Sequence, residues 1–269
     1  PTKPGCTFIG WTGSNGTTPQ TNITIEKGNT QDRTYNANYE FIKFTQGALS
    51  YECASGTEVK VTACNSGATS VTIPTTVTDN DVTYSVTAIA TGAFANCSGL
   101  KNINIPASVT SIGNHAFLGC TDLTSITVPS SVNSIGDYAF EMCSGLTEVF
   151  MESTTPPTLG NRAFDGCDEE LVIYVPAGTS ETYKDADGWE DYAYKIEDYG
   201  SCGDNVNWTY NTDTNTLTIF GTGAMANGQP WYCYSGEITK VVIRNGVTTI
   251  GDGAFALCNN LTSIDIPTS

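Results

Sequence analysis

Apolar and polar residues alternate in short runs along most of this chain, and residues 123–143, LTSITVPSSVNSIGDYAFEMC, show the full pattern. In LTSITV the leucine, isoleucine and valine are separated by polar residues, which predicts a short strand with one buried face. Pro129 is expected to end that strand. A second extended piece, SVNSI, follows. Gly136 then permits a sharp corner before DYAFEMC, which we predict to form a helical turn.

The same pattern returns at a nearly constant interval. Its phenylalanines are 23, 23 and 24 residues apart, and a fifth restarts the series after a gap of 91: Phe94, Phe117, Phe140, Phe164 and Phe255. One coil cannot bury its own apolar faces, so successive coils must stack. A period in the twenties with L-x-x-I-x-I/V in each unit indicates a leucine-rich-repeat solenoid. The predicted fold is an α/β repeat, a right-handed solenoid of short parallel strands plus helical turns.

Hairpins are expected to cap this solenoid. LSYEC and EVKVTAC flank the turn ASGT, which predicts a β-hairpin cap over residues 44–64. The phrases SVTSIGNHAFLGC and SVNSIGDYAFEMC resemble the 23-residue unit of the BspA-like leucine-rich-repeat family, and the likeness covers residues 69–196 and 200–269. Residues 174–196 are similar to the segment that closes such an array, and residues 202–225 to the hairpin cap that opens another.

The start of the chain is different. Residues 5–39 resemble part of a Listeria-Bacteroides repeat, a small β-grasp-like module of bacterial surface proteins, with Cys6 where tyrosine is usual. We therefore predict three parts: a partial module over 1–40, a first capped array over 41–198, and the cap and start of a second array over 199–269. The final phrase, SIDIPTS, stops one strand into a coil, so we expect that second array to be truncated.

Charge narrows the possible partners. The chain has 11 Lys and Arg against 28 Asp and Glu, for a net charge of −17. Such a surface repels phosphate backbones and anionic lipids, so we expect no nucleic-acid partner. No apolar run approaches the roughly 20 residues of a membrane span, so no membrane insertion is expected either. The surface is rich in Thr, Ser and Asn, which is typical of extracellular proteins.

The family resemblance implies a non-enzymatic bacterial protein that is secreted or held at the cell surface. It implies an adhesin whose partners are protein or glycan ligands on host matrix or neighbouring cells. Two alternatives remain open at this point. The chain could be a structural spacer that displays another module, or a carbohydrate-active enzyme with an unrecognised site. An aromatic and acidic patch would favour the adhesin, and a uniform Thr/Ser/Asn face would favour the spacer.

The residues themselves carry little catalytic signal. His115 is the only histidine, and Tyr138 and Arg162 fill the same repeat position in later coils. No serine or cysteine is spaced to complete a triad with it, so we interpret it as a solvent-facing side chain. The glycines of GTGAMANG are out of register for G-x-G-x-x-G, which favours a cap turn over a dinucleotide loop. The acidic clusters lack the spacing of a calcium loop: Asp168, Glu169, Asp187, Glu190 and Asp191. We predict no catalytic residue, metal or cofactor.

The ten cysteines fall into two sets. One set occupies a single repeat position: Cys97, Cys120, Cys143, Cys167 and Cys258. Residues at one repeat position point in the same direction rather than at each other, so we predict buried free thiols there. The pairing of the second set stays open, with Cys202 and Cys233 as the pair to inspect: Cys6, Cys53, Cys64, Cys202 and Cys233. No C-x-x-C pair occurs, so no zinc site is expected.

The outward face of the strands is the remaining candidate surface. Its central column is mostly small and polar: Thr72, Asn104, Thr127, Phe150, Tyr174, Val242 and Asp265. Phe150 and Tyr174 interrupt the column in consecutive coils, and exposed aromatic residues are common in binding hot spots. We predict a ligand-binding site at Phe150, Tyr174, Glu148, Asn104 and Thr127. Alternatively, the closing segment around Trp189, or the second cap, folds over the rings.

Overall fold

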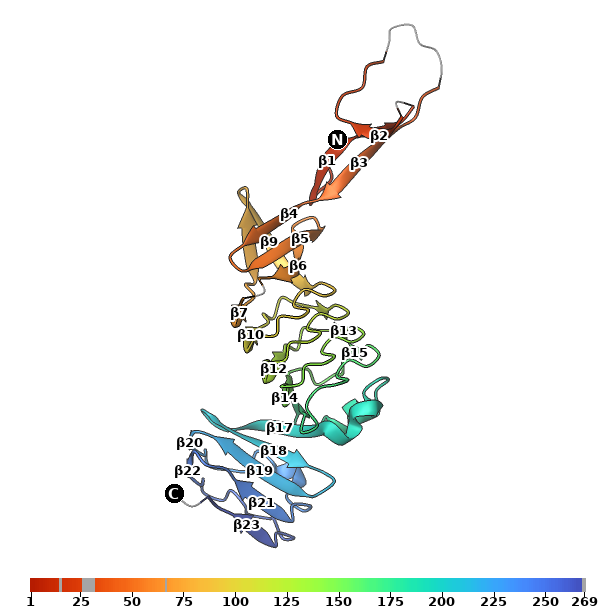
Figure 1. The fold of residues 1–269 in the computed structure, drawn as a ribbon. Helices are drawn as coiled ribbons and strands as arrows, with labels where there is room; N and C mark the ends of the chain where they lie inside the picture. Colours follow the sequence, from red (N-terminus) through yellow and green to blue (C-terminus); the bar gives the residue numbers. More distant parts are fainter. Residues whose placement is uncertain (15, 26–31, 66, 268–269) are drawn as a thin grey trace.

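The structure is a computed structural model that describes residues 1–14, 16–25, 32–65 and 67–267. The molecule is elongated, with a small sheet at the N-terminal end, stacked coils in the middle and a second set of strands at the C-terminal end (Figure 1). Part of the predicted N-terminal module, residues 26–31, and the last two residues of SIDIPTS lie outside the described residues.

The N-terminal sheet is antiparallel in the order β2-β1-β3, with strands β1 (Cys6–Gly13), β2 (Gly16–Gln20) and β3 (Tyr35–Phe41). The ring of Phe8 packs edge-to-face against Trp11 at 5.4 Å and Tyr39 at 5.8 Å. The backbone then continues into the next sheet through Ile42, whose N–H donates to the Gly5 carbonyl at 3.1 Å. The match to a partial β-grasp-like module stays a prediction.

A three-stranded antiparallel cap opens the first array, with strands β4 (Lys43–Gln46), β5 (Leu49–Ser55) and β6 (Glu58–Cys64). Strand β6 pairs in parallel with β9, which begins a parallel stack of β9 (Val82–Ile89), β11 (Ser111–Ile112), β13 (Ser134–Ile135) and β15 (Thr158–Leu159). Strand β8 (Thr76–Asp79) pairs antiparallel with β9. Tyr51, Val59 and Val61 of the cap are fully buried against the first coil.

The other edge of each coil contributes the strands β7 (Ser70–Thr72), β10 (Asn102–Asn104), β12 (Ser125–Val128), β14 (Glu148–Met151) and β16 (Val172–Pro176). Paired neighbours among them run parallel, with Ile126 opposite Val149 and Thr127 opposite Phe150. Ile126 and Val149 are buried and Thr127 is exposed, as the alternation in the sequence predicts. Strand β12 ends directly before Pro129.

The sheet does not stop where the first array ends. Strand β16 pairs in parallel with β17 (Ile196–Gly203). Strand β17 pairs antiparallel with β18 (Val206–Asn211), which pairs antiparallel with β19 (Thr216–Gly221). Strand β19 then pairs in parallel with β21 (Lys240–Ile243), and β21 pairs in parallel with β23 (Ser263–Asp265). A short pair, β20 (Gly223–Ala224) and β22 (Val247–Thr249), forms the second edge there. One sheet therefore joins two separate hydrophobic cores, which meet at β17.

The prediction of a helical turn in each coil is wrong. Residues 113–120 and their counterparts form tight turns, and the helices of the described residues are α1 (Ser180–Lys184), η1 (Glu190–Lys195) and η2 (Tyr232–Tyr234). His115 and Gly119 have φ of 54° and 69°, in the left-handed region, which a right-handed helix cannot accommodate. This geometry turns alternate N–H groups toward the next coil, so that Phe117 N–H donates to the Ala139 carbonyl at 2.7 Å.

Close stacking of the backbones also explains the repeated glycine. A Cβ built on Gly136 would lie 2.5 Å from the Asn114 nitrogen of the preceding coil, which is closer than real Cβ contacts. Gly136 has no positive φ, so space between coils, not conformational freedom, is what requires glycine here. Gly113 and Gly160 meet the backbone of their preceding coils in the same way.

A column of stacked rings fills the first core. Successive rings of the column are 5.1, 5.1 and 5.2 Å apart and within 8° of parallel: Phe94, Phe117, Phe140 and Phe164. Tyr192 of η1 ends the column, with its ring edge-to-face on Phe164 at 5.4 Å. In the second core Trp231 stacks on Phe255 at 5.9 Å. The segment that closes the first array, residues 174–196, thus covers the last coil of that array with aromatic side chains.

The repeated cysteines link one coil to the preceding one. The thiols of Cys120 and Cys143 donate to the carbonyls of Phe94 and Phe117 at 3.2 and 3.1 Å. The adjacent Cys143 thiol and burial raise the pKa of Cys120, and burial raises that of Cys167 to about 12. All ten cysteines lie in the described ranges and are free thiols there, with Cys202 buried and Cys233 exposed.

We predict that Phe117→Ala lowers the free energy of unfolding by about 3–5 kcal/mol, because rings on both sides prevent collapse into the cavity. Phe255→Ala should cost less, since Phe255 is only half-buried and stacks on one side. Denaturant unfolding combined with peptide-resolved hydrogen exchange measures both losses. Equal losses would contradict the stacking order.

We also predict that alkylation at about pH 8 labels Cys233 and spares Cys97, Cys120, Cys143 and Cys167 until the first array unfolds, because buried thiols ionise poorly and exclude reagent. Cys167 is only partly buried, contrary to the prediction from the sequence, and its protection depends on a pKa raised to about 12. Mass mapping before and after denaturation gives the order of labelling. A disulfide between any two of the four protected cysteines would overturn this expectation.

Candidate functional site

Aromatic and charged side chains gather on the outward face of the sheet where the two arrays join. Thr127, Phe150 and Tyr174 are register neighbours on β12, β14 and β16. On β17 the buried Ile196 and Asp198 alternate with outward residues. We name the group at this place the junction patch: Glu148, Phe150, Tyr174, Glu197, Tyr199, Phe220 and Arg244.

The rings of the junction patch pack on one another. Phe150 stacks on Tyr174 with centroids 4.9 Å apart, and Tyr199 meets the Phe150 ring edge-on at 5.5 Å. Phe220 of β19 stacks against Tyr174 at 6.4 Å. The Arg244 guanidinium lies 5.9 Å from the centre of the Phe220 ring, within range of a cation–π contact. The patch is therefore a small packed cluster outside the main cores.

Tyr174 is not an exposed hot-spot residue. Its exposure is 5%, because Tyr199 and Phe220 of the second array cover it, whereas Phe150 is half-buried. The cover comes from the second cap, as one of the two alternatives proposed, and not from Trp189, which packs on Tyr183 and Phe164 in the first core. The Tyr174 hydroxyl makes no hydrogen bond to a described residue, and its oxygen is not among the fully buried polar atoms, so it reaches solvent.

Two carboxylates lie on the strands that flank Tyr174, with Glu197 opposite it on β17 and Glu148 on β14. Burial, then the negative charges of Glu148 and Glu197, raise the pKa of Tyr174 to about 12, and Arg244 opposes them. Burial, then Glu152 at the end of β14, likewise raises the pKa of Tyr199. Two carboxylates and one guanidinium therefore act on the Tyr174 phenol, and burial is the largest cause of its raised pKa.

Asn104 and Thr127 lie in neighbouring coils, next to a shallow groove. This groove has a volume of about 390 Å³ and is lined by both residues together with Glu152 and apolar neighbours. It adjoins Phe150, since Thr127 is the register neighbour of that residue. The predicted residues thus divide between the groove and the junction patch.

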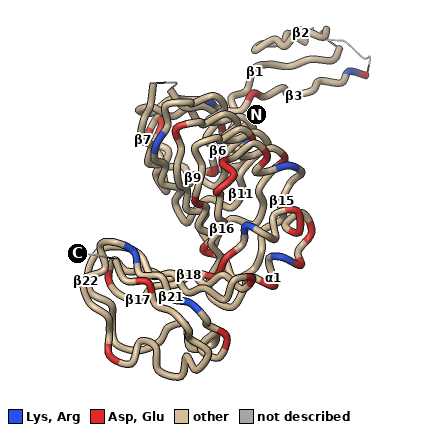
Figure 2. Tube along the Cα trace, turned by 60° about the horizontal axis from the view of Figure 1, so that its bottom comes forward, with Lys and Arg blue, Asp and Glu red and all other residues tan. Residues whose placement is uncertain are grey.

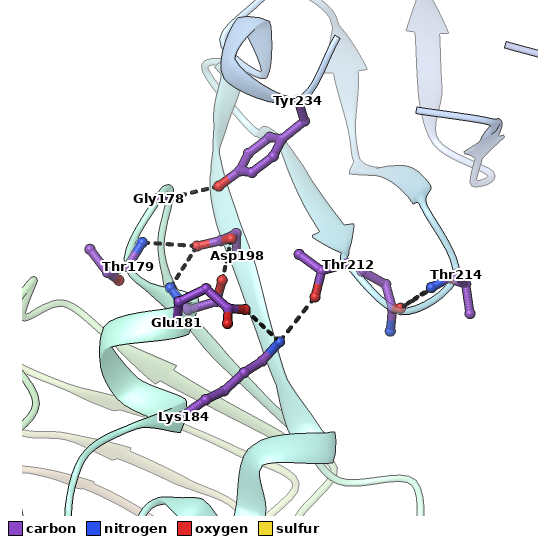
Figure 3. A network of polar contacts seen from close by, with 10 residues as sticks. Gly178, Thr179, Glu181, Lys184, Asp198, Thr212, Thr214 and Tyr234 are labelled. Atoms are coloured by element: carbon purple, nitrogen blue, oxygen red, sulfur yellow. Dashed lines mark hydrogen bonds and ion pairs between the residues drawn. The ribbon is translucent and has the colours of Figure 1, made fainter. Parts of the chain in front are cut away.

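Buried polar contacts fix the junction (Figure 3). Asp198 of β17, which is 1% exposed, accepts hydrogen bonds from the backbone N–H groups of Thr179 and Ser180 at 3.1 Å each and from the Ser180 hydroxyl at 2.6 Å. The Gly178 N–H donates to the hydroxyl of Tyr234, from the second array, at 2.7 Å. The same strand that carries Glu197 and Tyr199 is therefore anchored to both arrays.

Four residues of the junction patch were not predicted from the sequence: Glu197, Tyr199, Phe220 and Arg244. All four follow the alternation of β17, β19 and β21, so the outward pattern of the second cap contained them. Their proximity to Phe150 depends on the sheet running on through β16, β17 and the hairpin, which the repeat pattern does not encode.

Comparison with protein-family models shows which family this chain belongs to. Six copies of the BspA type leucine rich repeat region match residues 62–186 and 228–269. The chain belongs to the BspA-type leucine-rich-repeat family. The search of curated proteins gave no match.

Solved bacterial proteins are similar to this BspA-type chain. A leucine-rich repeat protein from Bacteroides capillosus ATCC 29799 is 25% identical, over 50% of this chain and 99% of that one, with a TM-score of 0.44. A leucine rich cell surface protein from Faecalibacterium prausnitzii A2-165 is 20% identical, over 84% and 77% of the two chains, with a TM-score of 0.38. A leucine-rich repeat protein from Bacteroides ovatus ATCC 8483 is 21% identical, over 83% of this chain and 53% of that one, with a TM-score of 0.43.

Elsewhere in this BspA-type chain, the side chains considered as catalytic candidates make structural contacts. His115 stacks on Tyr138 at 5.0 Å, and Arg162 pairs with Asp165 at 2.6 Å. In the described ranges no three metal-binding side chains cluster, and no helix is long and apolar enough to cross a membrane. Acidic positions are spread along both arrays, with few basic ones between them (Figure 2).

We predict that Tyr174→Phe flattens the alkaline loss of stability in this BspA-type protein. The folded-state pKa is raised above the usual 10, so the stability that depends on the neutral phenol is complete below pH 10 and is lost as pH rises toward 12. The variant should exceed the wild type by about 2–3 kcal/mol near pH 12 and differ little near neutrality. Denaturant unfolding across that range measures the difference.

The matched control is Tyr194→Phe, because the Tyr194 ring is 73% exposed in η1. Its stability profile should run parallel to that of the wild type. Equal behaviour of the two variants would show that Tyr174 ionises without the opposition of its neighbours.

Proposed function

We propose that this chain is a non-enzymatic binding protein of the bacterial cell surface, an adhesin for protein or glycan ligands on host matrix or neighbouring cells. The carrying observation is the junction patch, where aromatic rings and carboxylates interrupt an otherwise small and polar strand face. Aromatic residues set among polar groups are the usual anchors of binding surfaces. The adjoining groove at Asn104 and Thr127 extends the proposed surface along the coils.

Charge and family support this assignment. A net charge of −17 disfavours nucleic acid and anionic membranes as partners. The similar protein from Faecalibacterium prausnitzii is a leucine rich cell surface protein, and we propose the same location for this chain. We place the partial module over 1–40 and the arrays over 41–198 and 199–269 in one surface-exposed molecule.

A spacer role is the second candidate. The outward positions of the first coils are small and polar, as expected of a stalk with no ligand: Thr72, Asn104 and Thr127. A spacer function alone does not explain the aromatic rings of Phe150 and Tyr199 at outward positions of the junction. The adhesin assignment therefore accounts for more of this face.

The test is a screen of the purified chain against matrix-protein and glycan arrays, followed by titration of each hit with variants. Phe150→Ala should weaken binding about tenfold, the effect of losing one anchor side chain. Tyr194→Ala, which removes an exposed ring on η1, is the matched control and should bind as the wild type does. Thermal unfolding of both variants verifies that the fold is retained.

Two results would contradict the proposal. Absence of any ligand on either array would favour the spacer. Equal effects of Phe150→Ala and Tyr194→Ala would place binding away from the junction patch.

A further inference from the structure

The Tyr174 hydroxyl makes no hydrogen bond to a described residue, and its oxygen reaches the surface of the junction patch. The side chain is nine-tenths or more buried, with 5% of the residue exposed. A ligand can therefore reach this oxygen although most of the side chain is buried. Glu197 is the register neighbour of Tyr174 on β17, and Glu148 lies on β14 two residues before Phe150, the register neighbour of Tyr174 on the other side. The Tyr174 hydroxyl is therefore available to accept a hydrogen bond from a ligand beside the carboxylates of Glu148 and Glu197.

These carboxylates also have free capacity. Glu148 makes no hydrogen bond or ion pair within the described ranges. Glu197 accepts one hydrogen bond from the Asn211 side chain at 2.7 Å, which leaves most of its lone pairs free. With Glu152 and Arg244 included, the local formal charge is −3 + 1 = −2. Arg244 makes no ion pair in the described part of the chain, and its guanidinium lies over Phe220.

Ring geometry disfavours a sugar stacked on Tyr174. Phe150 at 4.9 Å and 29°, and Phe220 at 6.4 Å and 28°, stack against that ring, so the neighbouring rings occupy its faces. A ligand at this point meets the hydroxyl and the carboxylates. Three acceptors of this kind match the three N–H donors of an ammonium group or the fork of a guanidinium.

We propose that Glu148, Glu197 and the Tyr174 hydroxyl bind the cationic head of a lysine or arginine side chain from a basic polypeptide partner. The aliphatic stem of that side chain lies along the half-buried Phe150 ring, as long cationic side chains do on apolar surfaces. The net charge of −17 steers basic partners toward the chain. This inference rests on the proposed binding function and names the partner class for the same site.

The test uses a fluorescein-labelled, end-blocked peptide of glycine and serine with two lysines, titrated at about 0.15 M salt to screen diffuse attraction. Fluorescence anisotropy gives the dissociation constant. Glu148→Gln and Glu197→Gln should each weaken binding about tenfold, since each removes a charge-assisted contact. Tyr174→Phe should weaken it about threefold while the melting temperature stays level or rises, because the hydroxyl has no partner to lose. An arginine peptide should bind, and an acetyl-lysine peptide should not.

Glu190→Gln is the matched control, because it removes the same charge from an exposed position on η1. Carbodiimide coupling of the bound lysine peptide, followed by mass mapping, should place the new amide bond on Glu148 or Glu197. Equal weakening by Glu190→Gln, equal binding of the acetylated peptide, or coupling spread over other carboxylates would each overturn the inference. If basic peptides fail while an array ligand still depends on Phe150, the cation site is wrong and the proposed function stands.

Discussion

Hydrogen bonding between turn segments of successive coils is the constraint on which the rest of the first array depends. In each turn, alternate N–H groups leave their own coil and donate to the next one, as Phe117 does to Ala139. That pattern requires left-handed residues such as His115, so it excludes a helix and brings the coils close together. Close approach then requires glycine at Gly136 and permits the stacked phenylalanine column. Ring stacking and thiol contacts to the preceding coil follow from the same spacing.

Much of the interior could be predicted from the sequence because the pattern repeats. The inward leucine, isoleucine and phenylalanine positions follow from period and alternation alone. The turn conformation could not be inferred in this way, since His115, Tyr138 and Arg162 share a positive φ without sharing any side-chain chemistry. Nothing in DYAFEMC distinguishes a helical turn from two left-handed residues.

The candidate site was only partly predictable for a different reason. Phe150 and Tyr174 stand out in their column, so the sequence indicated these two aromatic residues of the junction patch. Burial of Tyr174 depends on Tyr199 and Phe220, which arrive through the hairpin that joins the arrays. Contacts of that kind depend on how the sheet continues beyond the first array. The sequence of a repeat unit does not say which strands follow the last repeat.

The continuous sheet has a mechanical consequence when the two ends of the molecule are pulled apart. Bonds from strand to strand run along the long axis, so a pull on the two ends loads them in tension rather than in shear (Figure 1). Hydrogen-bonded strand pairs loaded in this way separate one after another. The molecule therefore lengthens gradually under load instead of unfolding at a single threshold force. At β17, the Asp198 contacts to Thr179 and Ser180 add side-chain bonds to the backbone hydrogen bonds. The junction is therefore expected to yield later than the plain coils on either side of it.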